Sequence, residues 1–203
     1  MYYEIISTGS KGNCVIINDV MIDCGVPFNK IKNYLYDVKY LILTHVHTDH
    51  VRGSTLHYIK KNFPKLTIIG NHEVHQVYGV GVISNATFPI EVEGYTFTPF
   101  ECVHDVLTYG YTWEYEGLSI IYATDTSSLE NAPDLKYDFL FLESNHDEKK
   151  VEKILENKNQ FGYDAYSGAK RHLSTQQAKA FYYLHRRNKD SQFIELHQSS
   201  RFY

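Results

Sequence analysis

Cysteine is scarce in this chain of 203 residues, which contains three: Cys14, Cys24 and Cys102. An odd number at these spacings excludes a disulfide framework and a zinc ribbon, and it indicates reduced core thiols in a cytoplasmic protein. No apolar run approaches the roughly 20 residues that span a bilayer, so we expect no membrane partner. The N-terminal residues read at once as a strand, without the basic region and cleavage site of a secretion signal.

Positive charge is also limited, because 20 Lys and Arg residues face 24 Asp and Glu residues, for a net charge of −4. This balance excludes a broad basic surface for long duplex nucleic acid. Internal repeats and Pro/Gly/Ser-rich linkers are absent as well. We therefore predict a single domain over residues 1–203, in which about 70 % of the unfolded surface can be buried. A homo-oligomer is compatible with this sequence.

Hydrophobic periodicity predicts strands in two blocks, each accompanied by helices. The first block has strands at residues 3–7, 14–18, 20–23, 39–44 and 66–69 and helices at 29–36, 54–62 and 73–78. The second has strands at 90–92, 96–102, 109–114, 119–123, 138–142 and 192–196 and helices at 148–156 and about 175–186. We expect Ser54 to cap its helix, and Ser174-Thr175-Gln176-Gln177 to form a capping box. This order suggests two sheets stacked face to face with helices outside.

The densest group of polar side chains follows the predicted strand at 39–44, in His45-Val46-His47-Thr48-Asp49-His50. In an extended chain His45 and His47 point to the same side, so two neutral imidazoles can bind one ion. Asp49 and His50 come after the chain begins to turn, and they point towards a second ion roughly 3.5–4 Å away if the site is dinuclear. Burying such groups without a metal would cost roughly 1–3 kcal/mol each, so the pattern predicts a metal site.

This spacing, followed by Val51-Arg52-Gly53, resembles the metallo-β-lactamase superfamily. Residues 7–14 are similar to its opening glycine-rich loop, and Ile22-Asp23-Cys24-Gly25 to the segment of its first-motif aspartate. His104, Asp125 and His197 are similar to the residues of its third, fourth and fifth motifs. Within the superfamily the chain most resembles the YycJ (WalJ) group, which is near the ribonuclease Z branch. This resemblance rests on residues 9–14, His104-Asp105 with Gly110-Tyr111, residues 142–147 and His172-Leu173-Ser174.

The resemblance implies an α/β fold, the metallo-β-lactamase-like αββα four-layer sandwich, and a dinuclear metal-dependent hydrolase with a metal-bridging hydroxide. It assigns His45, His47 and His104 to one metal, Asp49, His50 and His197 to the other, and Asp125 as a bridge. Asp49 is thus expected to be needed for catalysis too. Imidazole and carboxylate donors without thiolate suit two divalent transition metals, Zn²⁺ or Mn²⁺, with Fe²⁺ as an alternative.

Further candidates lie outside the metal ligands. His172 precedes the predicted capping box, at a helix start that favours an anion, and Arg171 adds positive charge. The resemblance places His172 beside the scissile phosphate, as a phosphate contact or as the acid that protonates the leaving group. Glu143 is its expected orienting partner, with His146 as the alternative. Asp23 is expected to orient a metal-bound imidazole, unless it is an ordinary turn aspartate.

The resemblance to the YycJ group implies a phosphodiesterase or nuclease that cleaves nucleic-acid phosphodiester bonds. A phosphodiesterase for cyclic or small nucleotides is a close alternative, favoured by the net charge of −4. A third alternative is a metal-binding module that sequesters a nucleotide without turnover. The expected partner is in each case a nucleic acid or a nucleotide.

Overall fold

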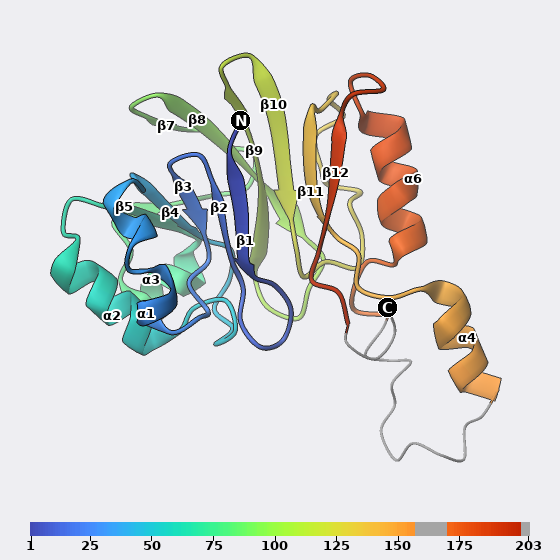
Figure 1. Cartoon of the computed structure of the whole chain (residues 1–203), viewed down its shortest axis with the longest axis horizontal. Coiled ribbons are helices and arrows are strands. Elements are labelled where there is room, and N and C mark those ends of the chain that lie inside the picture. The colour runs from blue at the N-terminus through green and yellow to red at the C-terminus, as the bar shows by residue number, and fades with distance from the viewer. Residues whose placement is uncertain (157–169, 200–203) are drawn as a thin grey trace. The chain divides into compact units, whose positions relative to one another are not determined.

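The computed structural model describes residues 1–156 and 170–199. The chain divides into two compact units, Met1–Asn85 and Ala86–Tyr203. Each unit is built around one sheet, which has six strands among the described residues (Figure 1). The single domain over residues 1–203 stays a prediction. Within the described ranges, no helix has the length and apolar character that crossing a membrane requires.

The first unit begins with an antiparallel hairpin and continues as a parallel sheet. Its strands are β1 (Tyr3–Ser7), β2 (Cys14–Ile17), β3 (Val20–Ile22), β4 (Tyr40–Leu43), β5 (Thr67–Gly70) and β6 (Val82–Ile83). Its helices are α1 (Phe28–Ile31), the 3₁₀ helix η1 (Tyr34–Tyr36), α2 (Gly53–Asn62) and α3 (His72–Tyr78). The strands follow chain order across the sheet, antiparallel from β1 to β3 and parallel from β3 to β6.

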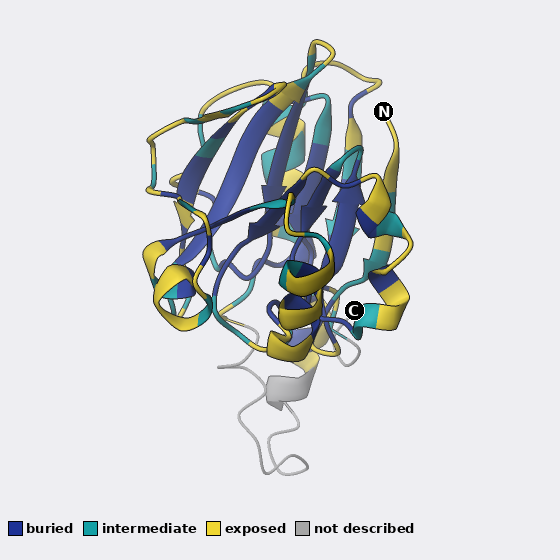
Figure 2. Ribbon diagram, turned by 90° about the vertical axis from the view of Figure 1, so that its left-hand side faces the viewer, coloured by how far each residue is buried: buried dark blue, intermediate teal, exposed yellow. Residues whose placement is uncertain are grey.

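Central strand β4 explains the apolar run that precedes the histidines. All its residues, Tyr-Leu-Ile-Leu, are buried, as expected of a parallel strand covered on both faces. On one face Leu41 and Leu43 join a core cluster with Leu56 and Ile59 of α2 and Val74 of α3. Full burial of each such side chain stabilises the fold by about 1.5–3 kcal/mol. The outer surfaces of the helices are exposed, whereas the strands are mostly buried (Figure 2).

The second unit has the same arrangement, with its antiparallel strands first and its parallel strands last. Its strands are β7 (Ile90–Val92), β8 (Tyr95–Cys102), β9 (Thr108–Tyr115), β10 (Leu118–Ala123), β11 (Phe139–Glu143) and β12 (Gln192–Leu196). Its described helices are α4 (Glu148–Glu156) and α6 (Thr175–His185). The order is β12-β11-β10-β9-β8-β7, antiparallel from β7 to β10 and parallel from β10 to β12.

Helix α6 packs against one face of the second sheet. Its Ala178 lies in a core cluster with Ile121, Leu140 and Leu142 of the sheet, and Leu173 joins the cluster just before the helix begins. The predicted capping box is confirmed by a pair of reciprocal hydrogen bonds between Ser174 and Gln177, at 3.0 and 2.9 Å. The packing and the cap together fix the chain immediately after His172.

Most predicted elements are present, but one predicted helix is split and another begins differently. The helix expected over 29–36 is split into α1 and η1. The prediction that Ser54 caps α2 is wrong, because the N-cap is Arg52, whose backbone is extended and which makes no side-chain cap. Tertiary contacts place this start: Arg52 N–H donates to the Cys24 carbonyl at 3.3 Å, and the Thr55 hydroxyl donates to the Val26 carbonyl at 2.6 Å.

Candidate metal centre

The predicted ligand segment of the first unit lies where two parallel strands end. Because β3 and β4 are parallel neighbours, Asp23 and Thr44 follow them at the same edge of the sheet. The chain then turns after His47, whose carbonyl accepts hydrogen bonds from the N–H groups of His50 at 3.0 Å and Val51 at 2.8 Å. The turn expected between the His-x-His pair and Asp49-His50 is therefore present.

Asp23 orients two of the three histidines. Its Oδ2 lies 2.6 Å from Nδ1 of His50, and its carboxylate accepts the Thr44 hydroxyl at 2.9 and 3.1 Å. That hydroxyl lies 3.0 Å from Nδ1 of His45, whose N–H it accepts. Both rings thus carry their proton on Nδ1, so the lone pair on Nε2 is the one available to a metal ion.

The imidazoles of this segment are gathered closely. The ring centroids of His45 and His50 are 4.1 Å apart, and those of His45 and His47 are 4.7 Å apart. His45 and His50 are completely buried. Three rings held this closely, two of them with fixed tautomers, form a donor set suited to a cation.

Gly25 allows the ligand turn to approach the strand ends. A Cβ atom at this position would lie 1.7 Å from the carbonyl oxygen of Asp49. The turn is held there by hydrogen bonds from Asn13 N–H to the Asp49 carbonyl, at 2.7 Å, and from Cys24 N–H to the His50 carbonyl, at 2.8 Å. Any side chain at position 25 would therefore push Asp49 and His50 away from Asp23.

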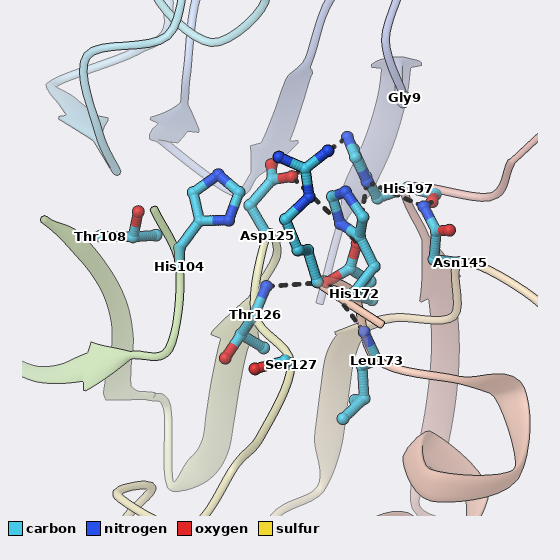
Figure 3. A network of polar contacts seen from close by, with 12 residues as sticks. Gly9, His104, Thr108, Asp125, Thr126, Ser127, Asn145, His172, Leu173 and His197 are labelled. Atoms are coloured by element: carbon cyan, nitrogen blue, oxygen red, sulfur yellow. Dashed lines mark hydrogen bonds and ion pairs between the residues drawn. The ribbon is translucent and has the colours of Figure 1, made fainter. Parts of the chain in front are cut away.

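In the second unit, three parallel strands deliver polar residues to one edge. Glu143 is the last residue of β11, Asp125 lies two residues beyond β10, and His197 directly follows β12. Asp125 and His197 both have a left-handed backbone, with φ 53°. Such a backbone is uncommon for residues other than glycine, and it often marks a functional position. Figure 3 shows the Asp125, His172 and His197 side chains converging.

Glu143 is the centre of this cluster and is completely buried. Its Oε1 lies 2.7 Å from Nδ1 of His172 and 2.9 Å from Nδ1 of His197, so it accepts from both rings. Its Oε2 accepts the backbone N–H of Thr126 at 2.8 Å and of Leu173 at 3.4 Å. One carboxylate therefore fixes the tautomers of two histidines and leaves both Nε2 atoms directed away from itself.

The cluster shifts the acidities of its members. Burial lowers the pKa of His172, but the hydrogen bond and the charge of Glu143 raise it more, so the pKa lies above its ordinary value. Burial raises the pKa of Glu143, whereas the hydrogen bonds from His172 and His197 lower it, and the pKa lies below its ordinary value. The arrangement therefore favours an ionised Glu143 beside a protonated His172.

The remaining candidates of this unit lie around the same carboxylates. Asp125 Oδ1 lies 3.5 Å from His172 Nδ1 and 3.5 Å from His197 Nε2. The ring centroid of His104 is 5.9 Å from that of His172, and the His104 side chain is only 6 % exposed. Donor atoms of Asp125, Glu143, His172 and His197 all lie within 4.8 Å of one another, close enough to surround an ion.

The helix start beyond His172 differs from the expected anion site. The Thr175 N–H donates to the His146 carbonyl at 2.9 Å, and the Ser174 hydroxyl both caps Gln177 and donates to Glu148 at 2.5 Å. The N–H groups of Thr175 and Gln177 are thus engaged by the chain's own groups. Arg171 is half-exposed, with its guanidinium 3.9 Å from the Asp105 carboxylate. A contact of the His172 and Arg171 side chains with a phosphate stays a prediction.

The donor chemistry fits a divalent transition metal. Each unit holds a buried cluster of imidazole and carboxylate groups at its strand ends. The three cysteines are buried and free, as predicted, and burial raises the pKa of Cys102 to about 12, so its thiol stays neutral. Burial also raises the pKa of Cys14 and Cys24. The donors thus correspond to the borderline ligands expected for Zn²⁺, Mn²⁺ or Fe²⁺.

The structure places every predicted site residue at a strand end or in an adjoining loop. Glu143 is hydrogen-bonded to His172, which is the pairing that the sequence suggested. Asp23 was expected to orient an imidazole that the sequence did not specify, and in the structure it is hydrogen-bonded to His50. His146 pairs through its backbone with Ser174, and its alternative role as the partner of His172 stays a prediction. The division of the ligands between two ions stays a prediction.

Two residues that hold the histidines were missed. The sequence pattern predicts Thr44 only as the end of a strand, although its hydroxyl joins Asp23 to His45. The Asn145 amide donates to the His197 carbonyl at 2.9 Å. The position of Thr44 directly before His45 was an available signal, but no sequence pattern connects Asn145 with His197.

Comparison with known proteins identifies the family. Residues 7–167 match the model of the metallo-β-lactamase superfamily. No curated protein matches the chain. Among solved structures, the chain is similar to the metallo-β-lactamase fold protein YhfI from Bacillus subtilis, with 17 % identity, TM-score 0.71, and coverage of 98 % of this chain and 86 % of that one.

Two further structures are similar over nearly the whole chain. For human tRNase Z, short form, the identity is 16 %, the TM-score 0.71, and the coverage 99 % of this chain and 93 % of that one. For a diphosphatase from the PhnP family, the identity is 18 %, the TM-score is 0.66, and the coverage is 98 % of this chain and 87 % of that one. At these identities the likeness concerns the fold, and it confirms the expected αββα class. The chain belongs to the metallo-β-lactamase superfamily, as a hydrolase with buried histidine and aspartate clusters for metal.

Proposed function

We propose that this protein is a dinuclear metal-dependent phosphodiesterase of the YycJ type that cleaves phosphodiester bonds in nucleic acid. The observation that carries the proposal is the hydrogen bond of 2.7 Å between His172 and Glu143, made beside Asp125. Hydrolysis by metal-activated water needs an anchored acid only when the leaving oxygen is poor. A nucleic-acid strand has such a leaving group, so a histidine anchored beside the metal ligands suits this substrate.

The ligands proposed for the two ions are those implied by the sequence: His45, His47, Asp49, His50, His104, Asp125 and His197. When bound, such ions supply ionised water at neutral pH and offset charge on the phosphoryl oxygens. Asp23 and Glu143 hold the histidines of their own units in the tautomers that leave Nε2 to a ligand. The protein groups thereby fix the donors before any ion arrives.

His172 has the properties of a proton donor to the leaving oxygen. Its Nδ1 is engaged by Glu143, so Nε2 is the nitrogen that can deliver a proton, and the side chain is 21 % exposed. Arg171 is the adjacent cation, and its partner Asp105 is itself half-exposed. Replacing that exposed ion pair by a contact to phosphate costs little, because exposed pairs contribute only about 0–1 kcal/mol.

The structural neighbours include enzymes for large and small substrates. Human tRNase Z acts on transfer RNA by its name, and the PhnP-family protein is named a diphosphatase. The net charge of −4 favours short or small substrates over long duplexes. A phosphodiesterase for cyclic or small nucleotides is therefore the second candidate.

The test is an activity panel on one preparation loaded with zinc and then with manganese. Short single strands of DNA and RNA are compared with cyclic nucleotides, using His172→Ala and the exposed His57→Ala as the active-site and control variants. The nuclease is supported if the wild type hydrolyses single strands, His172→Ala loses this activity and His57→Ala keeps it. Turnover of cyclic nucleotides alone would replace it with the second candidate. Tight nucleotide binding with no hydrolysis in either metal would mean that the protein sequesters its ligand.

A further inference from the structure

The side chain of Asn13 reaches the metal-binding nitrogen of a predicted ligand. Its Nδ2 lies 2.8 Å from Nε2 of His50, across 37 positions of sequence. Asn13 is 1 % exposed, and it belongs to the glycine-rich loop that precedes β2. No role for this amide follows from the ligand pattern. The contact of this buried amide with His50 therefore suggests a function for Asn13 beyond the ligand set.

The orientation of the Asn13 amide is fixed by its other contacts. Its Oδ1 accepts the Gly9 N–H at 2.7 Å, so the opposite end of the amide, Nδ2, faces His50. Nδ1 of His50 donates to Asp23 at 2.6 Å, which leaves a lone pair on Nε2. The contact is thus a hydrogen bond from the Asn13 amide to His50 Nε2.

This hydrogen bond and a metal ion compete for one lone pair. An ion bound by His50 Nε2 removes the acceptor of one Asn13 N–H. The other hydrogen on Nδ2 already has acceptors in the carbonyls of Gly9, at 3.2 Å, and Asp49, at 3.3 Å. A buried donor without an acceptor is costly, so the released N–H needs a new acceptor next to the ion.

We propose that Asn13 is a substrate-binding residue whose released amide N–H donates to a phosphoryl oxygen of the substrate. This inference rests on the proposed function, which places a phosphodiester at the metal ions. A phosphoryl oxygen carries negative charge and is drawn to the cation that His50 holds. A hydrogen bond to such an oxygen is stronger than one to a neutral group. Metal loading thereby converts an internal contact into a contact for substrate.

The proposal predicts opposite effects on metal and on substrate. In Asn13→Ala the ion no longer displaces a hydrogen bond, so metal affinity is unchanged or up to about tenfold tighter. Binding of a nucleoside 5′-monophosphate by the loaded protein weakens by roughly tenfold to hundredfold, and kcat/KM for a short single strand falls by a similar factor. Competition with a chromophoric chelator measures the first effect, and titration calorimetry measures the second.

Asn13 also closes its own loop, so a second variant separates function from folding. Asn13→Asp keeps the acceptor for Gly9 N–H but replaces the donor by a carboxylate that repels phosphate. It should retain metal and lose monophosphate binding at least as strongly as Asn13→Ala. Asn62→Ala is the matched control, because this exposed amide at the end of α2 donates to the Tyr58 carbonyl one turn earlier in the same helix.

Two results would overturn the assignment. One is loss of metal from both Asn13 variants to the extent seen in His50→Ala, which would make Asn13 part of the ion's support. The other is monophosphate binding and kcat/KM within twofold of wild type. If the wild type hydrolyses no phosphodiester, the proposed function fails by itself, and monophosphate binding still decides the role of Asn13. A wild type that neither hydrolyses a phosphodiester nor binds a monophosphate would overturn both the proposed function and the role of Asn13.

Discussion

Glu143 Oε1 lies 2.9 Å from Nδ1 of His197, so a buried carboxylate determines which nitrogen of this predicted metal ligand faces the site. The same oxygen holds His172 at 2.7 Å. The residue proposed as the acid and a residue proposed as a metal ligand therefore share one acceptor. A substitution of either histidine should therefore alter the hydrogen bond between Glu143 and the other histidine.

Glu143→Gln should impair both histidines. An amide group in place of the carboxylate must direct an N–H donor either at His172 and His197 or at the backbone donors of Thr126 and Leu173. We expect metal affinity to fall by about 10–100-fold. Because Glu143 raises the pKa of His172, the decline of activity at high pH should move to lower pH in the variant. Chelator competition and a pH–rate profile measure these effects.

The matched control for this carboxylate is Glu195→Gln. Glu195 is partly buried on β12 and accepts the Ser144 hydroxyl at 2.9 Å, without a histidine contact. Equal metal loss in both variants would contradict the orienting role of Glu143.

His172→Ala and His197→Ala should fail in different ways. We expect the first to lower the rate by roughly 10²–10⁴ with unchanged metal content, as for a positioned acid. The second should lose metal. With a nitrophenolate leaving group, which needs no proton, the His172→Ala defect should shrink if His172 is the acid and persist if it binds phosphate. Metal loss in His172→Ala alone would mean that the two roles are exchanged.

Metal content tests the dinuclear site directly. Protein from metal-sufficient medium should carry about two transition-metal ions per chain, because the seven predicted ligands suffice for two ions that share a bridge. Elemental analysis against protein concentration gives the ratio. One ion or none after reconstitution would refute the dinuclear arrangement.

Asp49→Ala or His50→Ala should abolish turnover while the chain remains folded, since the core of the first unit is formed by its strands and helices instead. Circular dichroism checks the fold, and the single-strand assay checks turnover. Activity retained within a factor of a few would exclude a necessary ion at these residues.

Thr44→Val should weaken metal binding although Thr44 touches no metal. The change removes the hydroxyl that joins Asp23 to His45, and we expect a loss of about 10–100-fold in affinity. Thr44→Ser should restore it. Thr55→Val is the control, because this buried threonine donates to the Val26 carbonyl and contacts no histidine. Equal metal affinity of the wild type and Thr44→Val in chelator competition would show that Asp23 alone is sufficient to hold the metal-binding histidines in place.

Local sequence patterns were enough to predict most strands and the ligand candidates. The four buried apolar residues of β4 and the spacing of His45, His47 and His50 are both read within one short segment. Ser54 was misassigned because the start of α2 is set by contacts to Cys24 and Val26, which lie far away in the chain. Strand β6 has only two residues, too few for a period.

The partners of the ligands were harder to predict, because they depend on strand register. Asn13 meets His50 only after β3 and β4 have paired and Gly25 has let the ligand turn approach. Glu143 meets His197 because β11 and β12 are parallel and end together. No local pattern carries such information, so the sequence alone predicts no role for Asn13.

Asp125 and His197 keep their positions at a cost in folding free energy, since a left-handed backbone costs a residue with a side chain about 1 kcal/mol or more. Glycine would relieve this cost at either position but offer no donor to a metal. Selection for heat resistance and selection for catalysis therefore act in opposite directions at these two positions. A library of variants sorted for folding alone should drift there towards glycine or asparagine, and lose its chemistry as it gains stability.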